Sequence, residues 1–274
     1  LAIGYNALVS ATNSPNTAIG TNALHLCTTG INNTAVGANT LSKSTIANDN
    51  LAIGCNALAS TTYGPNTAIG ISALQLCTTG INNTAVGTNA LLNSTTANSN
   101  TAIGFNSLTS VTTGHNNTAI GASALLLLTS GNSNIAIGVS AGTKYTAFEN
   151  KNILIANSGV EGDTLTTRIG SDQTRCFIAG INGVPSMGGL PVLVNSHGQL
   201  GTITSSNRFK ENITDAKIYD INKFRVVNYN YKGHPEIQEI GLIAEEVETH
   251  YPELIVYDDE KSPYTIQYND LIPI

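Results

Sequence analysis

A serine and a lysine lie five residues apart in the segment SSNRFKENI, residues 205–213. The hydroxyl of Ser205 can attack the carbonyl carbon of Thr204 through a five-membered ring, which turns the peptide bond into an ester that water then hydrolyses. A base must take the hydroxyl proton, and Lys210 can do so only as the neutral amine. Residues five apart on a regular helix point about 140° away from each other, so a turn has to separate the two side chains. Such a pair is common by chance and does not by itself indicate catalysis.

Charged neighbours bear on this chemistry. Arg208 can lower the pKa of Lys210 through its positive charge, or it can orient a carboxylate such as Glu245 or Glu246, and the sequence leaves both roles open. Glu245, Glu246 and Glu248 can also be read as acid catalysts. The simpler interpretation is an amphipathic helix that ends at the following proline and carries them on its solvated face.

The remaining composition excludes several classes of site. Cys27, Cys55, Cys77 and Cys176 form no CxxC pair, and no histidine lies at metal-ligand spacing, so we expect no metal and no cofactor. The net charge of −6 and the lack of a Lys/Arg cluster argue against nucleic acid as a partner. No apolar run approaches the roughly 20 residues of a membrane span.

The N-terminal half is built from a repeat of 16 or 17 residues. A glycine preceded by Ala-Ile or Ala-Val recurs nine times. An asparagine lies three residues before the Ile or Val, from Asn16 to Asn134, and a leucine follows the glycine by four residues, from Leu8 to Leu125. Residues 1–142 hold a single carboxylate side chain, Asp49, which argues against a polysaccharide-degrading tail spike because that chemistry needs paired carboxylates.

This period fits one coil of a parallel β-solenoid, with short strands and tight turns. Along N-T-A-I-G, strand alternation places Thr and Ile on one face and Ala on the other. Gly and Asn supply corners with positive φ, and stacked Asn side chains can bond along the axis. Coils about 4.8 Å apart would leave Cys27 and Cys77 about 14 Å apart, too far for a disulfide, so we expect both to be buried thiols.

A coil this thin buries little apolar surface, so we expect several copies of the chain to associate along the alanine face. The repeats resemble the head of trimeric autotransporter adhesins, whose NSVAIG-like units form a left-handed parallel β-roll in a three-chain bundle. The resemblance covers residues 1–142 and implies a homotrimer. The polar outer corners are expected to solvate the shaft, and a host-surface glycan or receptor is the alternative partner.

The leucine stripe fails at Gly142, and charged residues follow at once, so we expect the shaft to end there. Residues 143–204 are predicted to form a neck of short strands and turns, with ILIA, TRIG, CFIAGING and VLV among the strands. The stretch Asn195-Ser196-His197-Gly198 is typical of a hairpin turn, so we do not expect His197 to be catalytic.

Residues 205–274 have the composition of an ordinary globular module. Four blocks occur in order, SSNRFKENI, GLIAEEV, HYPELI and YTIQYNDLIPI. They resemble the intramolecular chaperone domain of phage endosialidases, of other phage tail spikes and fibres, and of a membrane-bound transcription factor of animals. Members of that family continue into long C-terminal helices, so we expect the module to be truncated near Ile274.

The resemblance implies a chemistry at the start of this module. The family pattern is a Ser, usually an Asp, any residue, Arg, any residue and Lys, with self-cleavage just before the Ser. It implies that the bond between Thr204 and Ser205 is cut, with Ser205 as nucleophile and Lys210 as base. Ser206 stands where Asp is common, and its use as nucleophile would shift the cut by one bond.

The sequence therefore predicts a mainly β homotrimer with three parts: a left-handed parallel β-roll shaft, a β-rich neck and a small α+β chaperone domain. We expect a fibre or adhesin segment, on a virion or on the cell surface, whose chaperone drives assembly and then releases itself. The alternative is a non-cleaving adhesin in which the C-terminal module is a permanent trimerisation clamp.

Overall fold

The computed structural model describes most of the chain, and the described residues are 1–12, 15–179, 181, 190–195, 197–202, 206–215, 219–232, 234–258 and 260–271. The chain forms two compact units, Leu1–Ala179 and Gly180–Ile274.

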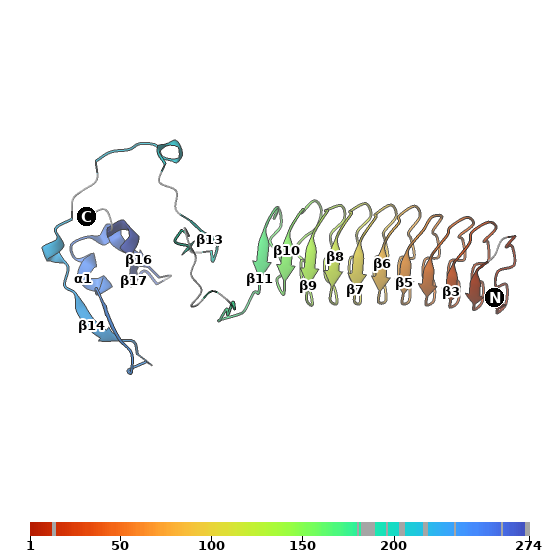
Figure 1. Cartoon of the computed structure of the whole chain (residues 1–274), viewed down its shortest axis with the longest axis horizontal. Helices are drawn as coiled ribbons and strands as arrows, with labels where there is room; N and C mark the ends of the chain where they lie inside the picture. Colours follow the sequence, from red (N-terminus) through yellow and green to blue (C-terminus); the bar gives the residue numbers. More distant parts are fainter. Residues whose placement is uncertain are drawn as a thin grey trace. The chain divides into compact units, whose positions relative to one another are not determined.

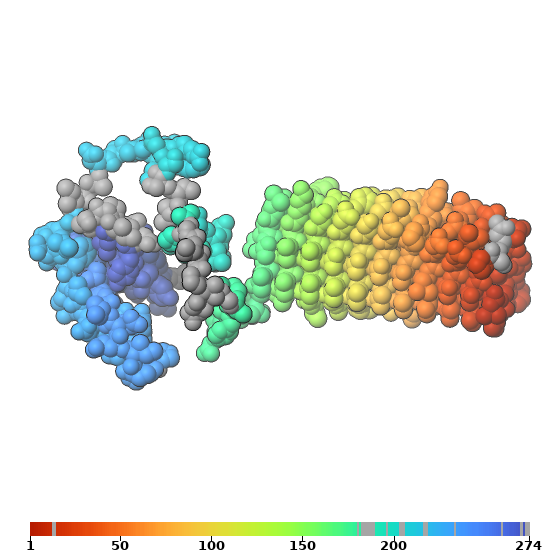
Figure 2. Space-filling model, viewed as in Figure 1, coloured from red at the N-terminus to blue at the C-terminus, as the bar shows by residue number. Residues whose placement is uncertain are grey.

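The first unit is a parallel β-solenoid, as predicted. Its 11-stranded sheet follows the order of the chain, and Figure 1 shows the strands as a row of arrows. Neighbouring coils are in register, so that Ala18 pairs with Ala35 and Ile19 with Val36. In the space-filling view the coils form parallel ridges (Figure 2). The strands are β1 Ala2–Ile3, β2 Thr17–Ile19, β3 Thr34–Val36, β4 Leu51–Ile53, β5 Thr67–Ile69, β6 Thr84–Val86, β7 Thr101–Ile103, β8 Thr118–Ile120, β9 Ile135–Ile137, β10 Ile153–Ile155 and β11 Thr167–Ile169.

The strand alternation is confirmed, but it corrects the expected face of association. In β2 to β8 the central alanine is fully buried, and the residues on either side of it face outward. These alanines pack against fully buried leucines such as Leu24 and Leu91 in one continuous core. The alanine face therefore fills the inside of a single chain's coil, where another chain cannot reach it. The apolar face left outside is the column of Ile and Val.

Tight corners close each coil. Gly87 has a φ of 138°, a conformation that glycine tolerates, and a Cβ there would lie 2.5 Å from the carbonyl oxygen of Gly104. Asn89 occupies the second corner with a φ of 58°, as expected for asparagine. Leu91 also has a positive φ, of 52°, which the sequence did not suggest. Complete burial of its side chain holds this backbone in place.

The repeated asparagines form a buried ladder along the axis, which confirms the predicted stacking. The backbone N and Nδ2 of Asn83 donate to Oδ1 of Asn66 at 3.0 and 3.2 Å, and Nδ2 also donates to the carbonyl of Ala97 at 2.8 Å. Oδ1 of Asn83 accepts from the backbone N and Nδ2 of Asn100 at 3.0 and 3.3 Å. Every donor and acceptor of the buried amide thus has a partner. The ladder runs on to Asn152, one coil beyond the last asparagine of the sequence pattern.

The parallel sheet also continues past residue 142, through β10 and β11. The sequence Asn152-Ile-Leu-Ile keeps the repeat pattern with a leucine in place of alanine, which is why this coil can form. At this end the buried ring of Tyr145 fills the core, and its hydroxyl donates to Asp163 at 3.0 Å. Arg168 forms an ion pair with the same carboxylate at 2.7 Å. The predicted strands ILIA and TRIG form β10 and β11, whereas the described residues of CFIAGING, 176–179 and 181, form no strand. The predicted domain limits at 142 and 204 stay predictions.

Both cysteines expected to be buried thiols are free and buried. Burial raises the pKa of the Cys77 thiol to about 11, which keeps it protonated and unreactive at neutral pH.

The second unit contains small antiparallel pairs and little helix. The hairpin of β12 and β13 has the predicted turn, because Oδ1 of Asn195 accepts from the backbone N of His197 and of Gln199, each at 3.0 Å. A small core gathers around Val247, Tyr251, Leu254, Ile255 and Ile266. The elements are β12 Leu193–Val194, β13 Leu200–Gly201, η1 Asn207–Phe209, η2 Ile221–Lys223, β14 Val227–Asn230, β15 Gln238–Gly241, α1 Ala244–Glu248, η3 Pro252–Leu254, β16 Ile255–Tyr257, β17 Pro263–Ile266 and η4 Tyr268–Leu271.

Candidate functional site

The segment that carries the predicted dyad folds as a single 3-10 turn. Ser206, with φ −66° and ψ 138°, precedes η1, and Lys210, with φ −124° and ψ 143°, follows it in extended backbone. The N–H of Phe209 donates to the carbonyl of Ser206 at 3.0 Å, and the N–H of Lys210 donates to that of Asn207 at 3.1 Å. A turn therefore lies where the spacing argument requires one. Thr204 and Ser205 lie outside the described residues.

The cationic side chains of this segment lie on the surface. The guanidinium of Arg208 stacks over the ring of Phe209, with 4.6 Å between Cζ and the ring centroid, in a cation–π contact. Phe209 and Lys210 are exposed. A base role requires Lys210 to lose its charge, which burial favours. The described residues of one chain do not bury it.

Glu246, which the sequence suggested as a possible partner of Arg208, is paired with Arg225 instead. Nε of Arg225 donates to Oε2 of Glu246 at 3.0 Å, and a second hydrogen bond joins Nη2 to Oε1. These hydrogen bonds, together with the charge of Arg225, hold the pKa of Glu246 below its ordinary value. Sequence reasoning missed Arg225 because its partner is 21 residues away and no local pattern links them. Glu248 is also engaged, since it accepts a hydrogen bond from Tyr257 at 2.9 Å.

Tyr251, which follows α1, packs against residues 219–224. Its hydroxyl accepts from the backbone N of Asp220 at 2.9 Å. Its ring meets Tyr219 edge-on at 4.8 Å and Phe224 at 5.3 Å between centroids. Contacts of this kind stabilise by about 1 kcal/mol beyond the area they bury. The signal in the sequence is the block HYPELI, which contains Tyr251.

Two findings on metal ions and membranes concern the part of the chain that the structure describes. No three His, Cys, Asp or Glu side chains come together there in a group that could hold a metal ion. Within the same described ranges, no helix has the length and apolar character needed to cross a membrane.

The chain thus consists of a parallel β-solenoid and a small C-terminal module of antiparallel strand pairs. Residues 205–256 match the family model described as the chaperone of endosialidase. The matched segment runs from the predicted nucleophile to the strand β16 and includes the aromatic contacts of Tyr251. The match supports an intramolecular chaperone domain in this part of the chain, and the family is named as a peptidase. Comparison with curated proteins and with solved structures gives no match.

Proposed function

We propose that this chain is a segment of a trimeric fibre or adhesin, on a virion or a cell surface, whose C-terminal module drives assembly and then releases itself. The observation that carries the proposal is the match to the chaperone family, because it begins at residue 205. That is the residue whose hydroxyl would attack the preceding peptide bond. The match supports a role in assembly, and cleavage between Thr204 and Ser205 rests on the likeness of residues 205–210 to the family pattern.

The outer face of the solenoid sheet supports association of several chains. Its Ile and Val column stays partly exposed, with fractional exposures of 37–39% at Ile53, Ile103 and Ile120. Because the strands are in register, these side chains form a continuous strip with steps of about 4.8 Å. An apolar strip of this length favours burial against another molecule. We place the trimer interface on this face, which replaces the alanine face expected from the sequence.

Repetition explains why such a shaft needs a chaperone. Neighbouring coils are so similar that two chains can pair one or more coils out of register with almost the same contacts. The segment LCTTGINNTAVG even recurs unchanged at 26–37 and 76–87. A module that trimerises first would align the three chains before the coils close. After its release the shaft would be held by its unfolding barrier.

The proposed cleavage follows from the chemistry of a serine hydroxyl. Oγ of Ser205 attacks the carbonyl carbon of Thr204 while Nζ of Lys210 takes the hydroxyl proton and passes it to the departing amide nitrogen. Water then hydrolyses the ester, leaving a carboxylate on Thr204 and a free amino group on Ser205. Since Lys210 is exposed in one chain, we expect assembly to bury it, so that cleavage follows completed folding.

Gel electrophoresis and mass measurement of the purified chain test this function. We expect two fragments, one ending at residue 204 and one starting at 205. The Ser205→Ala and Lys210→Ala variants should each remain one chain, and Ser206→Ala, the matched control, should still be cut. If the two dyad variants still split, the assignment is wrong. A wild-type trimer that stays intact would favour the alternative, an adhesin with a permanent clamp.

A host-surface glycan or receptor is the proposed partner of the polar outer corners. The exposed threonines Thr28, Thr62 and Thr78 support this, because they form a regular column in which each hydroxyl donates to the carbonyl of a threonine in the next coil. Their lone pairs still face solvent and can accept hydrogen bonds from a ligand. Glycan-array binding of the assembled shaft is the direct measurement.

A further inference from the structure

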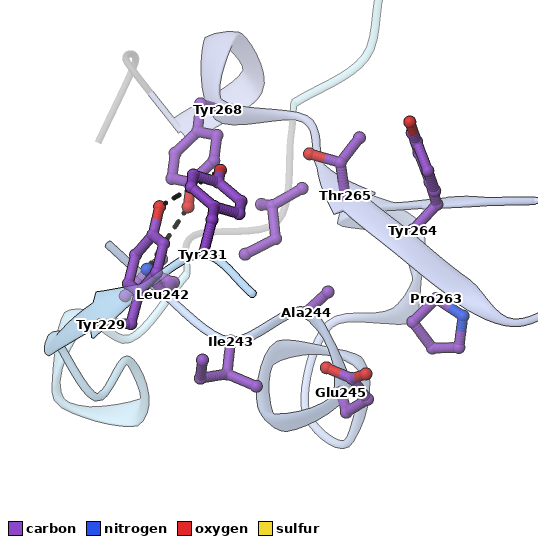
Figure 3. Close-up of a pocket in the computed structure, with 11 residues that line it drawn as sticks. Tyr229, Tyr231, Leu242, Ile243, Ala244, Glu245, Pro263, Tyr264, Thr265 and Tyr268 are labelled. Carbon is purple, nitrogen blue, oxygen red and sulfur yellow. Dashed lines mark hydrogen bonds between the residues drawn. The ribbon is translucent and has the colours of Figure 1, made fainter. Parts of the chain in front are cut away.

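The C-terminal unit has a cavity of about 240 Å³ that no step of the proposed assembly or cleavage uses. It lies between β14, the start of α1, β17 and η4. Four tyrosines line it, Tyr229, Tyr231, Tyr264 and Tyr268, and Glu245 contributes its single charge. Figure 3 shows Tyr229, Tyr231 and Tyr268 gathered on one side, with Pro263, Tyr264 and Glu245 on the other.

Three of these rings are held in place by contacts with their neighbours. The rings of Tyr229 and Tyr231 meet edge-on with 5.3 Å between centroids, and their hydroxyls lie 3.5 Å apart. The hydroxyl of Tyr268 accepts from the backbone N of Leu242 at 3.3 Å. Tyr231 and Tyr264 remain 62% and 74% exposed, so they present aromatic surface to a ligand.

The charge of the cavity comes from a carboxylate that the module does not otherwise use. Of the three glutamates in α1, Glu246 is paired with Arg225, and Glu248 accepts from Tyr257. Glu245 is exposed and lines the cavity, and within the described ranges it has no hydrogen-bond or ion-pair partner. Among the residues of this unit that the structure describes, no Lys, Arg or His lines the cavity.

Tyr229 stays neutral at physiological pH. The hydrogen bond that Tyr229 donates to Tyr231, together with desolvation and nearby negative charge, raises the pKa of Tyr229 to about 12. The cavity therefore combines one negative charge with the electron-rich faces of neutral phenol rings. Both features attract a cation.

We propose that this cavity binds the cationic end of a basic side chain, the guanidinium of arginine or the ammonium of lysine. The rings contact the cation through their faces, and the Glu245 carboxylate accepts its N–H groups. The volume is below that of sites for drug-sized ligands, which are roughly 300–1,000 Å³, and it suits one side chain. The side chain can come from a second copy of this chain or from a separate peptide.

Binding of a charged probe and its neutral isostere tests the proposal. N-acetyl-arginine methylamide and N-acetyl-citrulline methylamide differ in charge but hardly in shape. The chain has no tryptophan, and four of its ten tyrosines line the cavity, so part of the tyrosine emission of the 274-residue protein should change when a probe binds there. We expect the arginine probe to bind in the range of about 1–10 mM and the citrulline probe to bind at least about fivefold more weakly.

Removal of the negative charge at the cavity is the second test of the proposal. Glu245→Gln should weaken the arginine probe by about two- to fivefold, as expected for one exposed charge pair. Glu260→Gln removes the same charge from an exposed loop outside the cavity and should leave binding unchanged.

Sedimentation velocity separates the two sources of the side chain. If a second copy fills the cavity, Glu245→Gln and the arginine probe should each shift the protein toward smaller species. If a separate peptide is the ligand, the probe should bind with no change in sedimentation. The proposal is wrong if citrulline or a neutral methyl glycoside binds as tightly as arginine. It is equally wrong if Glu245→Gln alters neither binding nor sedimentation.

Discussion

Removal of one amide from the buried ladder should destabilise the solenoid far more than removal of an amide from its surface. Asn83 is 1% exposed and makes five hydrogen bonds along the ladder and to the neighbouring coil. In Asn83→Ala, the carbonyl of Ala97 loses its partner, and Asn100 loses the acceptor for its backbone N–H and for one amide hydrogen. Oδ1 of Asn66 keeps the backbone N–H of residue 83.

The expected loss follows from the three buried groups that remain unpaired. Each costs about 1–3 kcal/mol when no water replaces the partner. Partial relaxation lets water reach some of them, so we expect a total loss of about 3–6 kcal/mol. A loss of 3 kcal/mol already changes the unfolding equilibrium by a factor of about 100 or more.

Asn93→Ala is the matched control, because Asn93 is half-buried and its side chain has no hydrogen-bond partner among the described residues. Its effect should stay within about 0.5 kcal/mol. Urea unfolding of both variants, followed by circular dichroism after incubation long enough for the signal to stop changing, gives the difference. If the two variants lie within about 1 kcal/mol of each other, the ladder does not hold the coils together as argued.

Three further substitutions probe the corners, the core and the C-terminal end of the solenoid. Gly104→Ala should prevent normal folding, because the φ of Gly104 is 136° and the new Cβ would lie 2.5 Å from a carbonyl oxygen. Gly162 has a φ of 84° with open space around it, so Gly162→Ala should lower the free energy of unfolding by only about 1 kcal/mol, as measured by thermal unfolding. The buried hydroxyl of Ser94 has no hydrogen-bond partner among the described groups. Cys77 occupies the equivalent position one coil earlier, so a thiol fits this site. Ser94→Cys should therefore raise the free energy of unfolding by about 1 kcal/mol. Hydrogen bonds from Arg168 hold the pKa of Asp163 below its ordinary value. The stabilising contribution of the Asp163 carboxylate is therefore present above about pH 4, and it is lost as the pH falls through the lower pKa of the folded state. Circular dichroism from neutral to acid pH should show this loss, and Asp163→Asn should remove that part of the acid dependence; an unchanged acid transition would contradict the assignment.

The likeness between the predicted and observed solenoid comes from repetition. A residue such as Asn83 meets its own equivalents one coil before and after, so the pattern of the sequence is at the same time a list of spatial contacts. Gly87 and Asn89 could be placed at corners for the same reason, since their types match the backbone that a tight coil needs. Leu91 could not, because its positive φ is set by packing in the core and is unfavourable for leucine alone.

Beyond the repeats, the sequence pattern no longer predicts which residues are in contact. The end of the leucine stripe at Gly142 suggested the end of the shaft, yet β10 and β11 continue the sheet. Tyr145 and the ion pair of Arg168 take over the role of the repeated residues, and each depends on Asp163, which lies 18 and 5 residues away.

The sequence by itself determined the coil period, the glycine corners, the asparagine ladder and the place of the chaperone module, because these depend on residue types at fixed spacing. Only the tertiary structure decided that the alanines face inward, that Arg225 pairs with Glu246, and that four tyrosines and Glu245 line one cavity. The physical reason is that alternation divides a strand into two faces without saying which one the coil encloses. Likewise, the partner of a charge is set by the path of the chain through space and not by its neighbours in sequence.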